Sequence, residues 1–376
     1  MKKNKQMNLL IETFFNTESG PVLSLNIAQG LIRNDVCVCA IISEEIENLN
    51  DWKKTFKPDC LYIWKRYNNK YLENLLNDLK IKIKYFKRRF SYALYPNPVN
   101  RNLLIGRFIK HDENIMILHD VIPHSGTNDD VNRRHKELIM KADNIMVLSK
   151  KFIPIVEIDY HIPQGNIFYM RHGLMKYPTF EGEFNKVDSE SKINFLYFGR
   201  IEKYKGLHVL ADAYREIEKK YSDVTLTVAG SGDFAEYVEE YKSLKSATVM
   251  NKYITDEEIA YLFSKPNTVV VLPYIDATQS GVIGMAYNYG TPIIVSDTGG
   301  MKEQLFDGEV GVFAQPGDAK DLEEKMKNFI TNPDLFNEQK WLVAESKEKM
   351  TWEYICKELL MQLEEHKNRN NNSLEK

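Results

Sequence analysis

Long apolar runs are absent from this sequence. No stretch reaches the roughly 18 consecutive apolar residues that a membrane-spanning helix needs. The first residues, MKKNKQMNLLIETFF, lead into a strand-like segment without the small-residue cleavage site of a secretory signal. We therefore expect a cytoplasmic protein that is neither exported nor membrane-spanning.

Cysteine is scarce and positive charge is not in excess. The four cysteines lack the spacing of a zinc site, and Cys37 and Cys39 lie in the apolar run VCVCAII, so we interpret them as core thiols in a reducing compartment. The net charge of −3 argues against a general nucleic-acid-binding protein, because phosphate contacts need a basic face. We expect no nucleic-acid partner.

What the sequence does contain is a regular alternation of short apolar runs with helix-like segments, which is typical of βαβ units around a parallel sheet. Strand-like runs such as VCVCAIIS and DNIMVLS occupy the first half, and a polar, turn-rich segment at 177–192 precedes a second series that includes INFLYFGR and TVVVLPY. The pattern predicts two Rossmann-like, doubly wound α/β domains, 1–178 and 179–355. Residues 356–376 are predicted to form a helix that crosses back to the first domain and ends in a frayed polar tail.

Three predicted strand-to-helix turns in the second half could hold an anion: FGRIEKYKG, AGSGD and DATQSGVIG. Backbone N–H groups and the helix dipole at such turns favour a phosphate. In the first turn Gly199 allows close backbone approach, and Arg200 and Lys205 supply two cations, which suits a diphosphate without a metal ion. The alternative is a solvated charge pair on a loop, and AGSGD alone would indicate only a turn.

The order of several longer segments resembles retaining family 4 glycosyltransferases over roughly residues 193–325. These segments are YFGRIEKYKGLHVLADAYREI, LTVAGSGD, YITDEEIAYLFSKPNTVVVLPY, GVIGMAYNYGTPIIVSDTGGMKE and DGEVGVFAQPGDAKDL. The resemblance implies a GT-B fold, in which two Rossmann-like domains face a central cleft. It also implies transfer of a sugar from a UDP- or GDP-sugar, without a further cofactor or a metal site, as in bacterial members that make capsule or O-antigen polysaccharides.

The same resemblance implies roles for individual residues. Arg200 and Lys205 would bind the donor diphosphate, and the segment Gln279, Ser280, Gly281, Val282 would offer backbone N–H groups to the distal phosphate. Glu303 matches an acidic residue of the family, although helix capping is an equal alternative. Gly230 and Tyr253, in the AGSGD and YITDEE segments, complete the donor-binding candidates.

One departure from the family pattern concerns two glutamates eight positions apart, because Ala277 and Met285 occupy the matching positions here. Asp276 stands one residue before the first position and is a candidate replacement. We interpret the chain as a subfamily variant of the transferase. A nucleotide-sugar 2-epimerase on the same fold and a non-catalytic nucleotide-sugar-binding partner remain alternatives.

Catalytic candidates come from the first half. In ILHDVIPHSG, His119 and Asp120 directly follow an apolar run, which places them at the carboxyl edge of the predicted sheet, where α/β sites form. His119 could bond a donor-sugar hydroxyl and Asp120 could orient it or an acceptor hydroxyl, whereas the alternative is that both only cap a turn. Gly20, before Pro21, is expected at the turn after the first strand, and the resemblance to GT-B enzymes implies that this position lies near the acceptor and the donor phosphate. A Gly-Pro pair alone would indicate only a turn.

A basic stretch from Lys80 to Arg89 carries six cations among aromatic residues. Two interpretations fit the stretch equally: a solvated strand and turn, or a contact with an anionic membrane surface. We favour peripheral contact with the inner membrane face, since the resemblance implies a saccharide or lipid-linked acceptor.

Overall fold

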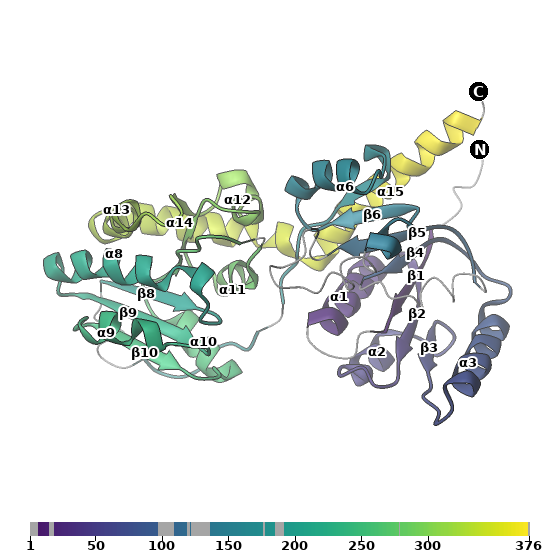
Figure 1. The fold of residues 1–376 in the computed structure, drawn as a ribbon, viewed down its shortest axis with the longest axis horizontal. Coiled ribbons are helices and arrows are strands. Elements are labelled where there is room, and N and C mark those ends of the chain that lie inside the picture. The colour runs from purple at the N-terminus through teal and green to yellow at the C-terminus, as the bar shows by residue number, and fades with distance from the viewer. Residues whose placement is uncertain are drawn as a thin grey trace. The chain divides into compact units, whose positions relative to one another are not determined.

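The computed structural model describes residues 7–14, 19–96, 109–118, 121, 136–175, 177–184, 192–277 and 279–374. They belong to two compact units, shown in Figure 1: unit 1 comprises Met1–Arg171 and Thr351–Lys376, and unit 2 comprises His172–Met350. The boundaries set from the sequence, after residues 178 and 355, lie a few residues later than these.

Unit 1 contains a seven-stranded parallel sheet in the order β3-β2-β1-β4-β5-β6-β7. Its strands are β1 (Asn8–Thr13), β2 (Cys37–Ser43), β3 (Leu61–Trp64), β4 (Arg89–Tyr95), β5 (Lys110–Leu118), β6 (Asn144–Val147) and β7 (Ile167–Tyr169). Within the described part of unit 1, the helices of more than one turn are α1 (Ser19–Arg33), α2 (Leu49–Thr55), α3 (Lys70–Tyr85), α6 (Ile153–Asp159) and α15 (Trp352–Leu374). Most strand residues are buried, as expected for a parallel sheet covered on both faces.

The C-terminal helix α15 packs against α1 of unit 1. Gly30 makes this close approach possible, because a Cβ at this position would lie 2.4 Å from the carbonyl oxygen of Trp352 and 2.6 Å from Cys356 Sγ. Buried Ile355 and Leu359 join the apolar core beside the sheet. The prediction of a frayed tail is wrong up to Leu374, where the helix ends.

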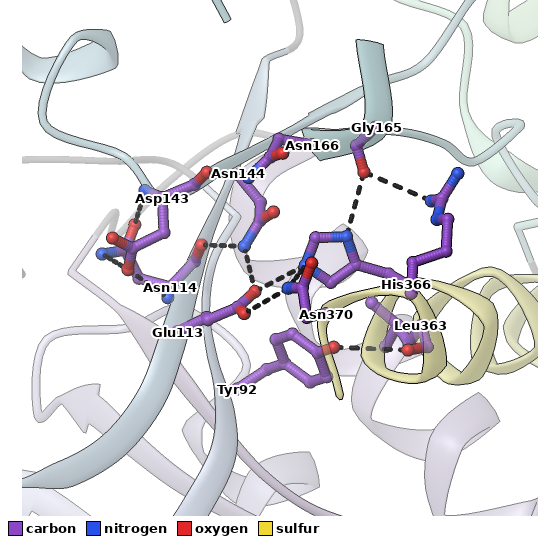
Figure 2. A network of polar contacts seen from close by, with 11 residues as sticks. Tyr92, Glu113, Asn114, Asp143, Asn144, Gly165, Asn166, Leu363, His366 and Asn370 are labelled. Atoms are coloured by element: carbon purple, nitrogen blue, oxygen red, sulfur yellow. Dashed lines mark hydrogen bonds and ion pairs between the residues drawn. The ribbon is translucent and has the colours of Figure 1, made fainter. Parts of the chain in front are cut away.

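Side chains late in α15 explain why the polar segment stays helical, as Figure 2 shows. The two ring nitrogens of His366 lie 2.9 Å from the carbonyl oxygen of Gly165 and 2.8 Å from Glu113 Oε2. Asn370 Nδ2 donates to Glu113 Oε1 at 3.1 Å, and Arg369 Nη2 donates to the same Gly165 carbonyl at 3.3 Å. These contacts tie the end of α15 to β5 and to the turn before β7.

Unit 2 has a six-stranded parallel sheet in the order β10-β9-β8-β11-β12-β13. Its strands are β8 (Ile193–Phe198), β9 (Val224–Gly230), β10 (Ala247–Asn251), β11 (Thr268–Leu272), β12 (Ile293–Ser296) and β13 (Val312–Ala314). Its α-helices are α8 (Leu207–Lys220), α9 (Val238–Lys242), α10 (Asp256–Ser264), α11 (Gly281–Tyr289), α12 (Met301–Gln304), α13 (Ala319–Thr331) and α14 (Pro333–Ser346). The strand order reverses direction between β8 and β11, which is the point where doubly wound sheets bind ligands.

Candidate functional site

The turns that follow β8 and β11 meet at the point where the strand order of unit 2 reverses. The first turn includes the 3-10 helix η3 (Lys203–Lys205) and ends at Gly206, whose φ of 68° is left-handed. A Cβ on Gly206 would lie 2.0 Å from the carbonyl oxygen of Pro273, so this position needs glycine. The Ile275 N–H donates to the Tyr204 carbonyl at 2.7 Å and joins the two turns.

Lys205 is the central cation of this site and is 91% buried, with 9% of its surface exposed. Its Nζ donates to Tyr274 Oη at 2.9 Å, and among the described residues it forms no ion pair. A Cβ on Gly199 would lie 3.4 Å from this Nζ and 3.9 Å from both Tyr274 Oη and Val282 Cγ2, so all of these groups surround one point. Burial lowers the pKa of Lys205, and the nearby Arg200 charge acts in the same direction. An ammonium group in this position lacks a counter-ion that an anionic ligand could supply.

Tyr274 connects Lys205 to the N-terminus of α11. Burial raises its pKa to about 12, so the phenol is neutral at physiological pH. Its Oη lies 3.3 Å from Ser280 Oγ, and Ser280 is the N-cap residue of α11, accepting from the Val282 N–H at 3.3 Å. The ammonium group and the positive end of a helix therefore belong to one buried polar chain.

Gln304 in α12 holds the other side of Ser280. The Ser280 N–H donates to Gln304 Oε1 at 2.8 Å, and Gln304 Nε2 donates to the Ser280 carbonyl at 3.2 Å. That the segment from Gln279 to Val282 offers backbone N–H groups to the distal phosphate stays a prediction. Those of Ser280 and Val282 already have acceptors within the chain, whereas the exposed Gly281 has none among the described residues.

Arg200 lies in the turn after β8, and Gly230 is the last residue of the neighbouring strand β9. The Arg200 side chain is exposed and has no ion pair within the described part of the chain, while Tyr197 Oη donates to its carbonyl at 2.9 Å and fixes the backbone. Gly230 has a φ of 153°, and a Cβ there would lie 1.8 Å from the Gly199 carbonyl oxygen. Gly230 thus allows the two turns to pack, and a ligand contact by it stays a prediction.

The remaining donor-binding candidates lie around this centre on separate segments. Tyr253 is 80% exposed in the loop before α10, and Glu303 is partly buried in the first turn of α12. Ala277 and Met285, at the two positions where the family has glutamates, are both buried, whereas the Asp276 side chain is exposed. No carboxylate replaces the two glutamates at their own positions, and a role for Asp276 stays a prediction.

The candidates in unit 1 are only partly described. β5 ends at Leu118, so His119 and Asp120 follow its carboxyl end in the sequence, but both lie outside the described residues. Gly20 is buried in the first turn of α1, which begins at Ser19, and not in the preceding turn as expected. A proline in the first helical turn, here Pro21, is well tolerated because the N–H that it lacks would have no helical acceptor.

The basic stretch does not form the strand and turn that the sequence suggested as an alternative. Lys80, Lys82 and Lys84 lie on helix α3, and β4 begins only at Arg89. Arg88 donates to Asp59 at 2.8 Å and to Cys39 Sγ at 2.9 Å, and Arg89 pairs with Asp112. The two arginines are therefore engaged within unit 1.

Two residues of the site were missed in the sequence. Tyr274 ends the apolar run TVVVLPY, where a tyrosine ordinarily indicates strand packing, and Gln304 follows Glu303 in a short polar helix. No local pattern connects Gln304 with Ser280, because the hydrogen bonds depend on how β11 and β12 pair.

Within the described ranges, no helix is long and apolar enough to cross a membrane. No group of three or more histidine, cysteine, aspartate or glutamate side chains in this part of the chain is arranged to hold a metal ion.

Comparison with known proteins gives a family match within unit 2. The model of the family described as glycosyl transferases group 1 matches residues 180–349. The glycogen synthase of Mycobacterium tuberculosis is 26% identical over 37% of this chain and 34% of its own length. The D-inositol 3-phosphate glycosyltransferase of an Arthrobacter species is 28% identical over 38% of this chain and 35% of its own length. The chain thus matches about a third of the length of these curated relatives.

The fold is shared over the whole chain with proteins of low sequence identity. A crystal structure of an Anabaena protein in complex with UDP superposes with a TM-score of 0.66 at 15% identity, covering 96% of this chain and 100% of the other. Residues 180–349 therefore match the glycosyl transferases group 1 model, on a chain whose two Rossmann-like units have the GT-B fold.

Proposed function

We propose that this protein is a retaining, metal-independent glycosyltransferase that moves a sugar from a UDP- or GDP-sugar to a saccharide or lipid-linked saccharide acceptor. We place this reaction in the synthesis of a cell-surface polysaccharide. The observation that carries the proposal is the buried Lys205 ammonium group at the switch point of the group 1 domain. Its partners among the described residues are all uncharged: the Tyr274 hydroxyl and the rings of Tyr204 and Tyr274.

The diphosphate of the donor would supply the missing counter-charge. The free energy cost of burying Lys205 is already present in the folded chain, so a bound diphosphate gains a strong interaction without reorganising the site. The exposed Arg200 would approach the same anion from the solvent side, and the Gly281 N–H would donate from the start of α11. These groups would stabilise the charge that develops on the leaving diphosphate.

The candidates for binding the sugar and the acceptor come from both units. Asp276 and Glu303 are the carboxylates near the diphosphate groups in sequence, and His119 and Asp120 follow the carboxyl end of a strand in unit 1. We assign His119 and Asp120 to sugar or acceptor hydroxyls, because both groups form hydrogen bonds with hydroxyls in their ordinary charge states. The proposal also includes donor contacts by Gly20, Tyr253 and Gly230.

Names of similar proteins support a nucleotide-sugar donor. One relative is named glycogen synthase, and the Anabaena structure is a complex with UDP. Neither observation identifies the acceptor. A panel experiment is therefore needed, in which the protein is incubated with radiolabelled UDP- and GDP-sugars and with saccharide or lipid-extract acceptors, with and without EDTA.

The proposal expects label on an acceptor, with the anomeric configuration of the donor retained and with activity that survives chelation. A changed free nucleotide sugar or free nucleotide without glycoside would indicate an epimerase, and tight nucleotide-sugar binding without turnover would indicate a non-catalytic partner. Complete loss of transfer in EDTA, restored by magnesium or manganese, would contradict metal independence.

We also propose that the enzyme works at the inner face of a membrane, where lipid-linked acceptors are found. The basic stretch from Lys80 to Arg89 supports this location, but Arg88 and Arg89 are already engaged by Asp59 and Asp112. The lysines on α3 and the following turn would contact the anionic headgroups.

A further inference from the structure

Helix α3 presents two different faces, and its inner face fixes its orientation. Ile81 and Tyr85 are buried in the core of unit 1, and Glu73 accepts from Trp64 Nε1 at 2.9 Å. Asn77 accepts from Tyr62 Oη at 2.7 Å and donates to the Lys65 carbonyl at 2.8 Å. These four residues recur every fourth position, so the face that they define cannot rotate outward without breaking buried hydrogen bonds.

The opposite face of α3 is apolar and exposed. We call it the outer stripe, and it consists of Leu72, Leu75, Leu79, Ile83 and Phe86. Their spacing of three or four residues places them on one side of the helix and its C-terminal end. Their exposed fractions rise from 47% at Leu72 to 69% at Ile83. Contiguous exposed apolar surface of this kind is rare on a free surface and marks an interaction site.

Exposed large apolar side chains are concentrated around the outer stripe. Of the fourteen large apolar side chains that are exposed among the described residues, seven lie between Tyr67 and Phe86. The others are scattered over both units. Figure 1 shows α3 beside β3, which is the edge strand of the unit 1 sheet.

Cations accompany the C-terminal half of the stripe. Lys80, Lys82 and Lys87 are exposed, and no acidic residue occurs between Leu79 and Arg89. Lys82 and Lys87 form no ion pair within the described part of the chain, and Lys80 Nζ only contacts Tyr67 Oη at 3.3 Å. The whole chain carries a net charge of −3, so this apolar and basic surface differs from the protein average.

We propose that α3 lies in the interfacial region of an anionic bilayer, with the outer stripe among the acyl chains and Lys80, Lys82 and Lys87 at the headgroups. This inference rests on the proposed membrane location and names the surface that makes the contact. A helix of 16 residues is only about 24 Å long and cannot cross the hydrocarbon core, so it would lie parallel to the membrane plane. Lysine side chains are long enough to reach the headgroups from such a position.

Charge favours an anionic bilayer over a second copy of this chain as the partner that covers the outer stripe. A symmetric pair of outer stripes would bring two sets of lysines together, and Asp78 is the one acidic residue in the sequence from Leu75 to Arg89. Anionic headgroups instead offer opposite charge along the whole length of the helix. The apolar stripe and the lysines therefore act on one partner, and each can be tested separately.

The test is sedimentation of the full chain with vesicles of phosphatidylcholine alone or mixed with phosphatidylglycerol, at low and high salt. The stripe variant combines Leu75→Gln, Leu79→Gln and Ile83→Gln, and the charge variant combines Lys80→Gln, Lys82→Gln and Lys87→Gln. A matched control replaces exposed apolar residues elsewhere, with Ile158→Gln, Trp341→Gln and Met361→Gln. Circular dichroism and thermal unfolding check that each variant folds.

We expect the parent and the matched control to bind vesicles that contain phosphatidylglycerol. The stripe variant should lose about tenfold or more in partitioning at both salt concentrations, because three apolar side chains no longer leave water. The charge variant should lose binding mainly at low salt, since high salt already screens these cations in the parent. In an Ile83→Trp variant, the fluorescence emission of the introduced tryptophan should shift to shorter wavelength when vesicles are added.

Three results would overturn the inference. The parent could fail to sediment with anionic vesicles, the stripe variant could sediment as the parent does, or the parent could form a dimer that the stripe variant abolishes while neither binds vesicles. UDP binding and transfer to a soluble acceptor should be equal in the parent and in all variants. Vesicle binding without any transfer would reject the proposed function and leave the membrane contact intact.

Discussion

Replacement of Lys205 by methionine tests the donor site most directly. Methionine keeps most of the buried apolar stem and removes only the ammonium group, which donates to Tyr274 Oη and lies 3.4 Å from a Cβ placed on Gly199. Lys203→Met is the matched control, because Lys203 lies in the same 3-10 helix, carries the same charge and pairs with Glu236 at the surface.

The magnitude follows from the hydrogen-bonding capacity of the ammonium group. One of its three N–H donors is used by Tyr274, so the others can bond a diphosphate oxygen. A hydrogen bond to a charged group contributes about 1.5–3 kcal/mol, which corresponds to roughly a 10- to 150-fold loss in affinity for the nucleoside diphosphate. Isothermal titration of UDP and GDP into the parent and both variants measures this loss.

The same substitution weakens diphosphate binding but should stabilise the unliganded protein at neutral pH. Burial lowers the pKa of Lys205 below its ordinary value of 10.5, so the folded chain binds fewer protons than the unfolded chain between the two pKa values. The free energy of unfolding of the parent therefore rises as the pH increases through this window. Without ligand, Lys205→Met should be more stable than the parent at neutral pH, and the difference should narrow as the pH approaches 10.5.

Two results would refute this reasoning. Unchanged diphosphate affinity in Lys205→Met would show that the ammonium group does not face the donor. An equal loss in Lys203→Met would show that only the general charge of the segment matters. Thermal unfolding at several pH values in the absence of nucleotide tests the stability effect independently of binding.

Three further predictions concern the surroundings of the site and the packing of α15. Arg200→Ala should weaken diphosphate binding by about 1.5–3 kcal/mol at low salt and by less at high salt, since its side chain is exposed, and titrations at two salt concentrations measure this. Gln304→Leu should lower the free energy of unfolding by about 1–3 kcal/mol and weaken UDP binding, because the buried Ser280 N–H and carbonyl lose their partner; unchanged values in both assays would contradict it. Gly30→Ala should destabilise the protein by about 1–3 kcal/mol through a clash with Trp352, whereas Gly165→Ala, with no atom near the added Cβ, should not, and urea unfolding compares them.

The alternation of strands and helices could be predicted because it follows from local patterns. The strand of INFLYFGR, the helix of GLHVLADAYREIEKKY and the strand of TVVVLPY occur as β8, α8 and β11. Their apolar residues either run continuously or repeat at helical spacing, and both patterns are visible within one segment. The fold class of the chain depends mainly on such segments.

Helix α3 shows where a local pattern misleads. In KIKIKY the lysines alternate with isoleucines, which is the period of a half-exposed strand. The structure continues the helix that Asn69 caps, and places Ile81 in the core while Ile83 is exposed. Two residues that look equivalent in the sequence therefore have opposite surroundings, because the helical period separates them by about 200°.

The candidate site was predicted where one turn carries the chemistry and missed where distant segments meet. Gly199, Arg200 and Lys205 follow one strand and are recognisable together. The hydrogen bonds that hold Ser280 come from Gln304 on another helix, and no pattern near either residue indicates them. At the start of α11, the N–H groups of Ser280 and Val282 therefore already have acceptors within the chain.

Charged side chains are usually exposed and large apolar side chains usually buried, and this protein departs from both rules, at Lys205 and at the outer stripe. A charged group is buried at the end of β8, and a row of large apolar side chains is exposed along α3. Each arrangement costs free energy in the free protein, and each becomes favourable with a ligand of matching character, an anion for the first and acyl chains for the second. Substitutions that remove either feature should therefore leave the free protein as stable as the parent or more so, while weakening binding of one ligand only. That pattern separates a functional departure from an ordinary packing defect, whose correction would improve stability without loss of any binding.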